Sequence, residues 1–282
     1  MVVPMKLHLL QLTSSPEVAA NLAAVAALVE QAAPAPGDLL LLPENFAVFG
    51  GGSEHLLAHA EVPNTGPVQQ FLAELARRWQ ITVVGGTQPL WPATGQHQGK
   101  AYAACLSYGA DGQLLSRYNK IHLFDVDVSD GTGRYRESDS TLAGGELCLF
   151  DAGGIRIGVM VCYDLRFPEL ARLYAEAGAQ LLLVPAAFTA VTGAAHWQLL
   201  LRARAVENQL FVAASGQTGH HANGRHTWGH SMLVDPWGTV VADGGSAPGI
   251  TSVSPDWTLI EQVRQRMPLA RHNRFACNWR ED

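Results

Sequence analysis

The chain has 282 residues, 48% of them hydrophobic and 16% charged, so it is long enough and apolar enough to bury a large core. Its formal net charge of −6 excludes the strongly basic surface expected of a nucleic-acid-binding protein. The most apolar run, residues 181–187, contains Pro185 and is too short to span a membrane.

Short apolar runs alternate with amphipathic stretches from the N-terminus onward. The apolar runs predict buried strands at residues 6–11, 39–42, 81–85, 155–161, 181–184 and 211–214. The amphipathic stretches predict helices at residues 15–33, 67–79, 168–177 and 197–208, the first opening with a Ser-Pro-Glu cap and first turn. Strands that alternate with helices indicate an α/β fold.

Two turn sequences predict β-hairpins within this pattern. An Ala-Asp-Gly turn separates residues 101–108 from 113–118, and an Asp-Pro-Trp-Gly turn separates residues 231–234 from 239–241. The predicted sheet is therefore mixed. Because no Ser/Gly-rich linker or internal repeat divides the chain, we expect one domain.

The four cysteines form no Cys-x-x-Cys pair, so a zinc ribbon or a thioredoxin-type redox motif is not expected. The N-terminal sequence lacks the charged, apolar and small-residue regions of a secretion signal. We therefore expect reduced thiols and a cytoplasmic location.

Cys162 stands directly after the strand-like run at residues 154–161 and shortly before Pro168, which can open a helix. A cysteine at a strand end that faces a helix start is well placed to react, because nearby backbone N–H groups stabilise a thiolate. From position alone, a buried structural cysteine is at least as common.

Glu44 and Lys120 also follow strand-like runs. Glu44 comes after four leucines and a proline, where a carboxylate is costly to bury unless it is paired or acts as a base. Lys120 is flanked by apolar and aromatic residues and could stabilise an oxyanion in a pocket. A solvent-facing loop glutamate and a surface lysine are the simpler alternatives.

Two segments could suggest metal sites, and neither has the required pattern. Residues 125–131 resemble the start of a calcium loop, but Asp130 replaces the required glycine and Arg136 replaces the bidentate glutamate. The histidines at 220, 221, 226 and 230 lack zinc-finger spacing and cysteine partners, which favours a polar loop. We expect no metal and no cofactor.

Taken together, the blocks LLLLPENF, YNKIHLFD and GVMVCYDLRFPEL resemble the nitrilase, or carbon–nitrogen hydrolase, superfamily over nearly the whole chain. The signature of that family is a Glu–Lys–Cys triad, which falls here on Glu44, Lys120 and Cys162. The resemblance implies an α/β fold, a four-layer α-β-β-α sandwich with two mixed β-sheets in a single domain over residues 1–282. It also implies a homodimer or higher homo-oligomer, with a tail at about 265–282 that could pack on a partner subunit.

The resemblance also implies the chemistry, hydrolysis of a linear amide at a C–N bond other than a peptide bond. Glu44 takes the thiol proton, Cys162 attacks the amide carbonyl, and Lys120 with the backbone N–H after Cys162 holds the oxyanion. Water activated by Glu44 then hydrolyses the thioester. Glu137 matches a second glutamate that supports the lysine or the substrate in this family.

Within the superfamily, the stretches RESDSTLAGG, FTAVTGAAHWQLLLRARAVENQ and GHSMLVDPWGTVVA resemble the deaminated glutathione amidases, with the ω-amidases next. The implied partner is a small-molecule amide and neither nucleic acid nor a membrane. For a deaminated glutathione amidase, the substrate is deaminated glutathione, which is cut to 2-oxoglutarate and cysteinylglycine in metabolite repair. For an ω-amidase, the substrate is 2-oxoglutaramate or succinamate. A catalytically inactive binding or scaffold protein on the same fold is the alternative from another class.

Deaminated glutathione and 2-oxoglutaramate share a keto-acid head, so we expect a cationic group near Cys162. Arg166 is the first candidate, Arg202 and Arg204 are weaker ones, and Arg204 is expected to pair with Glu207 on its own helical face. The candidates for substrate contact are Tyr163, Arg166, Phe188 and His196.

Overall fold

The computed structural model of the chain describes residues 5–93, 99–129 and 133–278. One large sheet consists of β1 (Leu7–Gln11), β2 (Leu39–Leu41), β3 (Thr82–Leu90), β4 (Ala101–Tyr108), β5 (Leu114–Asn119), β8 (Thr141–Leu142) and β17 (Gly249–Val253). Its order is β17-β1-β2-β3-β4-β5, with β8 paired to β4. The strands β1, β2 and β3 are parallel, β17, β4 and β5 pair antiparallel with β1, β3 and β4, and β8 pairs parallel with β4, so this sheet is mixed.

The second large sheet consists of β9 (Leu149–Ala152), β10 (Ile155–Val159), β11 (Leu181–Ala186), β12 (Phe211–Gly216), β15 (Met232–Val234) and β16 (Val240–Asp243). Its order is β16-β15-β12-β11-β10-β9. The central strands β10, β11 and β12 are parallel and the outer ones antiparallel, so this sheet is also mixed.

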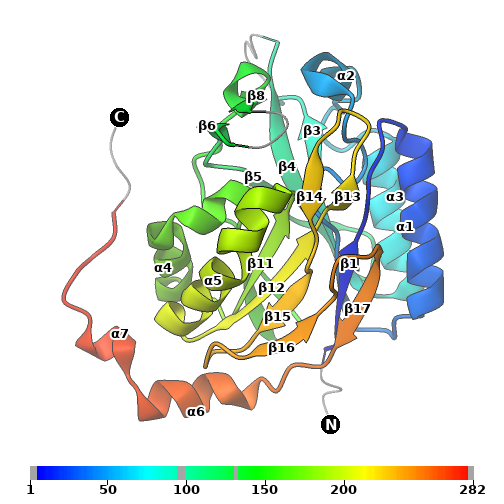
Figure 1. Cartoon of the computed structure of the whole chain (residues 1–282). Helices are drawn as coiled ribbons and strands as arrows, with labels where there is room; N and C mark the ends of the chain where they lie inside the picture. Colours follow the sequence, from blue (N-terminus) through cyan, green and yellow to red (C-terminus); the bar gives the residue numbers. More distant parts are fainter. Residues whose placement is uncertain (1–4, 94–98, 130–132, 279–282) are drawn as a thin grey trace.

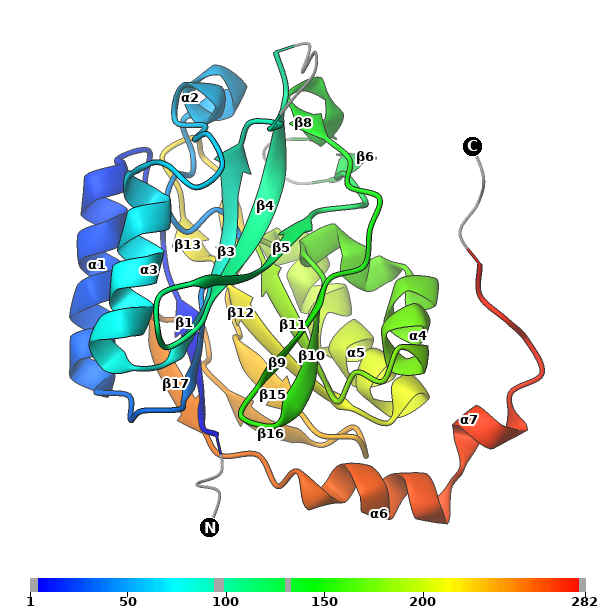
Figure 2. The same ribbon diagram turned by 180° about the vertical axis from the view of Figure 1, so that it is seen from behind.

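Helices cover the outer faces of the two sheets, and Figures 1 and 2 show the resulting layers from opposite sides. The first sheet is covered by α1 (Val18–Ala32) and α3 (Pro67–Trp79), and the second by α4 (Pro168–Glu176) and α5 (Ala190–Asn208). Near the C-terminus, α6 (Thr258–Arg266) runs below the sheets, and α7 (Leu269–His272) leads into a tail that stands away from the body (Figure 1).

Several short elements lie at one end of the sandwich. They are α2 (Gly52–Ala58), the paired strands β6 (Asp125–Asp127) and β7 (Arg134–Arg136), the paired strands β13 (Thr218–His220) and β14 (His226–Trp228), and the 3₁₀ turns η1 (Glu137–Asp139) and η2 (Cys162–Arg166). Several of these elements supply walls of the site described below.

The leucine run that precedes Glu44 explains how the layers hold together. Side chains of a strand alternate between its two faces, so Leu39 and Leu41 pack in the core that contains the second sheet, whereas Leu40 and Leu42 pack beneath α1 and α3. All four leucines are fully buried. Across the two sheets, the Ser215 hydroxyl donates to the Leu41 carbonyl at 2.9 Å.

The observed layers confirm the predicted α-β-β-α sandwich with two mixed sheets. The predicted strands and both hairpins are present in the described residues, with β3, β11 and β12 longer than expected. The strand β11 continues through Pro185, which lies opposite Ser215 in the register with β12.

Two predicted helices begin elsewhere than expected. The helix α5 begins at Ala190 and not at residue 197, because the Thr189 hydroxyl caps it by accepting a hydrogen bond from the Thr192 N–H at 3.2 Å. The helix α1 begins at Val18, and Ser15 is not its cap. The Ser15 N–H instead donates to Oδ1 of Asn21 at 2.9 Å.

The polar loop predicted for the histidine-rich segment is wrong at His220 and His226, which lie in strands. His220 and His226 lie opposite each other in the hairpin of β13 and β14, and their rings stack with centroids 4.0 Å apart. His221 is buried and its Nε2 lies 2.8 Å from the Thr227 hydroxyl. The loop that connects β13 and β14 carries Arg225.

No helix within residues 5–93, 99–129 and 133–278 is long and apolar enough to cross a membrane.

Candidate active site

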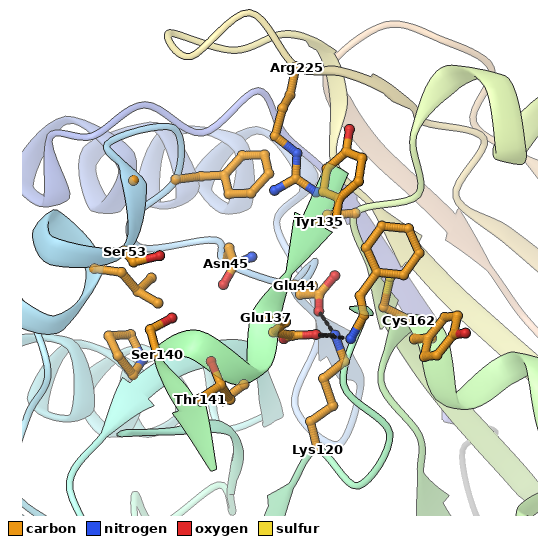
Figure 3. Close-up of a pocket in the computed structure, with 18 of the residues that line it drawn as sticks. Glu44, Asn45, Ser53, Lys120, Tyr135, Glu137, Ser140, Thr141, Cys162 and Arg225 are labelled. Carbon is orange, nitrogen blue, oxygen red and sulfur yellow. Dashed lines mark hydrogen bonds and ion pairs between the residues drawn. The ribbon is translucent and has the colours of Figure 1, made fainter. Parts of the chain in front are cut away.

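A cavity of about 280 Å³ collects the residues predicted to carry the chemistry (Figure 3). Glu44, Lys120, Glu137 and Cys162 all line it. Glu44 follows the carboxyl end of β2 and Cys162 that of β10, while Lys120 follows β5. The structure thus brings together three side chains that are far apart in the sequence.

Glu44 is held at the base of the cavity by its backbone. Its carbonyl accepts a hydrogen bond from Nε2 of Gln217 at 3.0 Å, which ties the segment after β2 to the second sheet. On the other side, Gly86 of β3 approaches so closely that a Cβ there would overlap the Pro43 carbonyl. The carboxylate is therefore buried, with 4% of the residue exposed, and its position is tightly constrained.

Lys120 is among the most deeply buried charged residues described, with 1% of its surface exposed. Its N–H continues the β4 ladder by donating to the Ala103 carbonyl at 3.0 Å. Its Nζ donates to Oε1 of Glu44 at 2.8 Å and to Oε2 of Glu137 at 2.8 Å, the contacts dashed in Figure 3. One ammonium therefore lies between two carboxylates.

Glu137 is itself fixed by the neighbouring chain. Its Oε2 accepts a hydrogen bond from the Phe124 N–H at 2.7 Å, in addition to the contacts with Lys120. Because burial dominates, the pKa of Glu137 is raised above its usual value, although the Lys120 charge opposes that shift.

Cys162 begins the turn η2 with a φ of +48°, a left-handed conformation that non-glycine residues seldom adopt. The residue is 7% exposed and lines the cavity, so its sulfur is not sealed off. Burial and the nearby Glu44 charge raise the pKa of the thiol well above its usual range, while Lys120 and the Ala187 backbone oppose that shift. The cysteine is therefore a thiol that needs a base, and Glu44 is close enough to accept its hydrogen.

The electrostatics of Lys120 keep it charged. Burial alone would lower its pKa, but Glu137, Glu44 and Cys162 together raise the pKa well above the ordinary lysine value. A permanently charged ammonium beside a thiol can stabilise negative charge that develops on a bound carbonyl oxygen.

Asp164, which sequence reasoning missed, braces the turn that carries Cys162. Its carboxylate is fully buried and accepts hydrogen bonds from the Tyr118 hydroxyl at 2.7 Å and the Val161 N–H at 2.9 Å. Its other oxygen accepts from the N–H of His122 at 2.9 Å and contacts the ring Nδ1 at 2.8 Å. Asp164 thereby joins the cysteine turn to the residues on either side of Lys120.

The four residues predicted to contact substrate lie in two different places. Tyr163, Arg166 and Phe188 line the cavity. His196 is exposed and is not among the lining residues, and its Nδ1 accepts a hydrogen bond from Nη1 of Arg166 at 3.2 Å. The guanidinium of Arg166 also lies over the rings of Phe188 and Tyr163, at 5.0 and 5.8 Å from their centroids.

The two weaker arginine candidates lie outside the cavity lining. Arg204 is buried, pairs with Glu207 at 3.0 Å as predicted, and donates from Nη2 to the Leu165 carbonyl at 2.9 Å. Arg202 is exposed and donates to the Gly238 carbonyl at 2.7 Å.

One cation of the cavity had no sequence signal. Arg225 lies between β13 and β14, in the loop of the histidine-rich hairpin that the residue pattern did not reveal. It lines the cavity near Tyr135, as Figure 3 shows, and its guanidinium lies over the rings of Tyr135 and Phe49. Only the three-dimensional approach of this hairpin brings it there.

Within residues 5–93, 99–129 and 133–278, no group of three or more His, Cys, Asp or Glu side chains is arranged to hold a metal ion. Asp125 and Asp127, from the segment weighed as a calcium loop, lie in β6, whereas Asp130 and Gly131 lie outside the described residues.

Comparison with known proteins identifies the family of this chain. The sequence matches the family described as Carbon-nitrogen hydrolase over residues 6–265. It is 44% identical to the deaminated glutathione amidase of Synechocystis sp. over 272 residues, which cover 95% of this chain and 97% of that protein. It is 38% identical to an omega-amidase of Xenopus laevis over 270 residues, covering 95% of each chain.

A solved structure gives the same result for the fold. The crystal structure of Saccharomyces cerevisiae Nit3, a member of branch 10 of the nitrilase superfamily, superposes with a TM-score of 0.82 at 34% identity, covering 98% of this chain and 99% of that one. The family match and these relatives span nearly the whole sequence, so this chain belongs to the carbon–nitrogen hydrolase family.

Proposed function

We propose that this amidase cuts its substrate through a thioester on Cys162, with Glu44 as the base and Lys120 as the oxyanion-stabilising cation. The observation that carries the proposal is the meeting of these three side chains in one cavity, with the Lys120 ammonium 2.8 Å from the Glu44 carboxylate. The raised pKa of the Cys162 thiol makes an adjacent base necessary, and Glu44 supplies it.

In the first step, Glu44 accepts the thiol proton as the sulfur attacks the amide carbonyl carbon. The negative charge that develops on the carbonyl oxygen is stabilised by Lys120 and by the backbone N–H of Tyr163, the residue after the nucleophile. Glu44 then returns its proton to the amide nitrogen, the C–N bond breaks, and the amine leaves. The acyl group remains bound to the sulfur of Cys162.

In the second step, water replaces the amine. Glu44 takes a proton from the water as its oxygen attacks the thioester carbonyl, and the same donors stabilise the new oxyanion. The C–S bond breaks, the carboxylic acid is released, and the proton returns to the sulfur. No histidine is required, and Glu137 keeps Lys120 in place during both steps.

The proposed substrate is deaminated glutathione, which would be cut to 2-oxoglutarate and cysteinylglycine. The relative named deaminated glutathione amidase, 44% identical over most of its length, supports this choice. Arg166, four residues after Cys162, is the proposed partner of the keto-acid carboxylate, since it lines the cavity and forms no ion pair among the described residues.

A second candidate is an ω-amidase, which would release ammonia from 2-oxoglutaramate or succinamate. The relative named omega-amidase, 38% identical over 270 residues, favours it. Deaminated glutathione and 2-oxoglutaramate share the 2-oxoglutaryl acyl half, so the two candidates share the roles proposed for Glu44, Lys120, Cys162 and Arg166.

The deciding experiment compares kcat/KM of the purified protein on deaminated glutathione and on 2-oxoglutaramate. We expect faster turnover of deaminated glutathione, and a clear preference for 2-oxoglutaramate would favour the ω-amidase. Cys162→Ala serves as the inactive control. A protein that hydrolyses neither amide while binding a ligand in the cavity would favour a catalytically inactive binding or scaffold protein.

We also propose that the protein is a homodimer or a higher oligomer. Leu199 on the outer face of α5 is 66% exposed and Phe275 in the tail is 85% exposed, which supports contacts with a second copy. Light scattering of the purified protein in solution should give at least twice the mass of one chain. A monomeric mass would contradict this proposal. The cytoplasmic location stays a prediction.

A further inference from the structure

Arg225 is held rigidly at one wall of the cavity by two aromatic rings. Its guanidinium carbon lies 4.6 Å from the ring centroid of Tyr135 and 5.0 Å from that of Phe49. Both rings are at least nine-tenths buried. Stacking of this kind fixes the plane of a guanidinium while leaving its N–H edge available to a ligand.

The side-chain N–H groups of Arg225 lack an acceptor within the described ranges, whereas its backbone N–H donates to Oδ1 of Asn223 at 3.2 Å. Its Nε is buried without a hydrogen-bond partner, and it forms no ion pair with the carboxylates of residues 5–93, 99–129 and 133–278. A buried donor without an acceptor is uncommon in folded proteins. Nε and one Nη together form the fork that binds a carboxylate through two parallel hydrogen bonds.

A second stacked guanidinium, that of Arg166, marks a different part of the same cavity. Between the two arginines runs a row of aromatic rings: Tyr135 lies 5.0 Å from Phe124, and Phe124 lies 5.2 Å from Tyr163, measured between centroids. Tyr163 in turn contacts Arg166. Each end of this aromatic row therefore carries a cation.

The catalytic candidates lie beside the middle of the aromatic row. The Phe124 N–H donates to Glu137, which holds Lys120, and Tyr163 directly follows Cys162 in η2. An extended tripeptide spans roughly 10 Å. An amide of that size is long enough to lie along the three rings, with its C–N bond near Cys162 and a carboxylate toward each arginine.

We propose that Arg225 binds a second carboxylate of the substrate, on the amine half that leaves when the C–N bond breaks. Arg166 shares the turn of Cys162, so it suits the acyl half that stays on the sulfur. Arg225 comes from a hairpin loop whose neighbours Asn223 and Gly224 are exposed, so it suits the half that departs first toward solvent. The inference rests on the proposed function and specifies its substrate class, an amide with a carboxylate on each half.

Other cations of the cavity suit this role less well. Lys120 is occupied by Glu44 and Glu137. Arg136 donates to the Val126 and Tyr135 carbonyls and pairs with Asp127, and Arg134 is exposed without the aromatic contacts that fix Arg225.

The test uses deaminated glutathione and its analogue in which the glycine carboxylate is replaced by a neutral amide. For Arg225→Gln we expect kcat/KM on deaminated glutathione to fall roughly 10- to 100-fold, the usual effect of losing hydrogen bonds to a charged group. Turnover of the neutral analogue and of 2-oxoglutaramate, neither of which has the second carboxylate, should stay within about 3-fold of wild type. Arg225→Lys keeps the charge without the fork, so its kcat/KM on deaminated glutathione should lie between the values of wild type and Arg225→Gln.

Arg202→Gln is the matched control, because Arg202 is an exposed arginine outside the cavity lining. An equal loss on all three substrates would overturn the inference, since Arg225 would then serve the acyl half or the fold. No loss on any of them would overturn it as well. Wild-type protein that hydrolyses 2-oxoglutaramate but not deaminated glutathione would overturn this inference and the choice of deaminated glutathione but leave the thioester mechanism standing, whereas inactivity on every amide would overturn that mechanism as well.

Discussion

Oε1 of Glu44 lies 2.8 Å from Nζ of Lys120, although the two residues are 76 positions apart in the sequence. Neither side chain has more than 5% of its surface exposed. A buried ion pair of this kind adds little to stability by comparison with well-packed apolar groups, so we infer that it is kept for chemistry.

Replacing Glu44 by Gln should remove the base while keeping the shape of the side chain. We expect kcat to fall roughly 10²- to 10⁴-fold, the usual contribution of a general base, with little change in substrate binding. Steady-state release of amine or ammonia measures the loss. Glu207→Gln, at a carboxylate that pairs with Arg204 outside the cavity, is the control and should keep nearly full activity. Retained activity in the Glu44 variant would exclude it as the base.

Replacing Lys120 by Met should leave two buried carboxylates facing each other without a cation. We expect a loss of about 3–5 kcal/mol in the free energy of unfolding at pH 7, the usual cost of breaking a buried pair. Lys6→Met, at an exposed lysine, is the control and should change the free energy of unfolding by less than about 0.5 kcal/mol.

The Lys120 effect should depend on pH in a defined direction. Because the folded pKa of Lys120 is raised, its contribution to stability is complete below the ordinary lysine pKa and is lost as the pH rises through the raised value. In the Met variant, protonation of the carboxylates relieves their repulsion, so its deficit should shrink as the pH falls toward that of ordinary glutamates. Thermal unfolding from pH 4 to 9 measures this, and a deficit independent of pH would contradict it.

The pH profile of kcat/KM should reflect a thiol that stays protonated. The raised pKa of Cys162 keeps it neutral through the ordinary cysteine range, and the raised pKa of Lys120 keeps that group charged. We therefore expect a flat profile between pH 7 and 9, with no rise near the value of about 8.5 typical of a free cysteine. Protonation of Glu137 removes a carboxylate that holds Lys120, and because the pKa of Glu137 is raised, we expect an acid limb above the ordinary glutamate pKa. A profile that climbs steadily through pH 8.5 would mean that a free thiolate attacks.

Asp164 should act as a positioning residue. Asp164→Asn places an amide N–H opposite the donors on Tyr118 and Val161, so we expect a loss of about 2–3 kcal/mol in stability. The variant should also react more slowly with a small alkylating reagent at Cys162, a readout that global destabilisation alone would not change below its melting temperature. Tyr118→Phe, which removes a single hydroxyl from the same network, should show a smaller effect on both measurements.

The sequence predicts the parts of this site that depend on strand ends. Glu44, Lys120 and Cys162 each follow a run of apolar residues. Such runs are recognisable because a strand that is buried on both faces consists almost entirely of apolar residues. That the three meet was implied only by the family resemblance, since pairing between distant strands leaves no local pattern. Glu137 was likewise a family inference.

Asp164 and Arg225 could not be predicted in the same way. The partners of Asp164 are Tyr118 and His122, which lie more than forty positions away at contacts set by tertiary packing. Arg225 belongs to a hairpin with three-residue strands and mostly polar side chains, which resembles a loop in any hydrophobicity pattern. Its contact with Phe49 and Tyr135 joins three segments that share no sequence motif.

The most direct measurement is the mass of the protein during turnover. In a rapid-quench experiment with excess amide, mass spectrometry of the digested protein should find the acyl group on the Cys162 peptide, and Cys162→Ala should give neither adduct nor product. Sustained hydrolysis of the amide by the Cys162→Ala variant, or turnover that passes through an adduct on another residue, would contradict the mechanism.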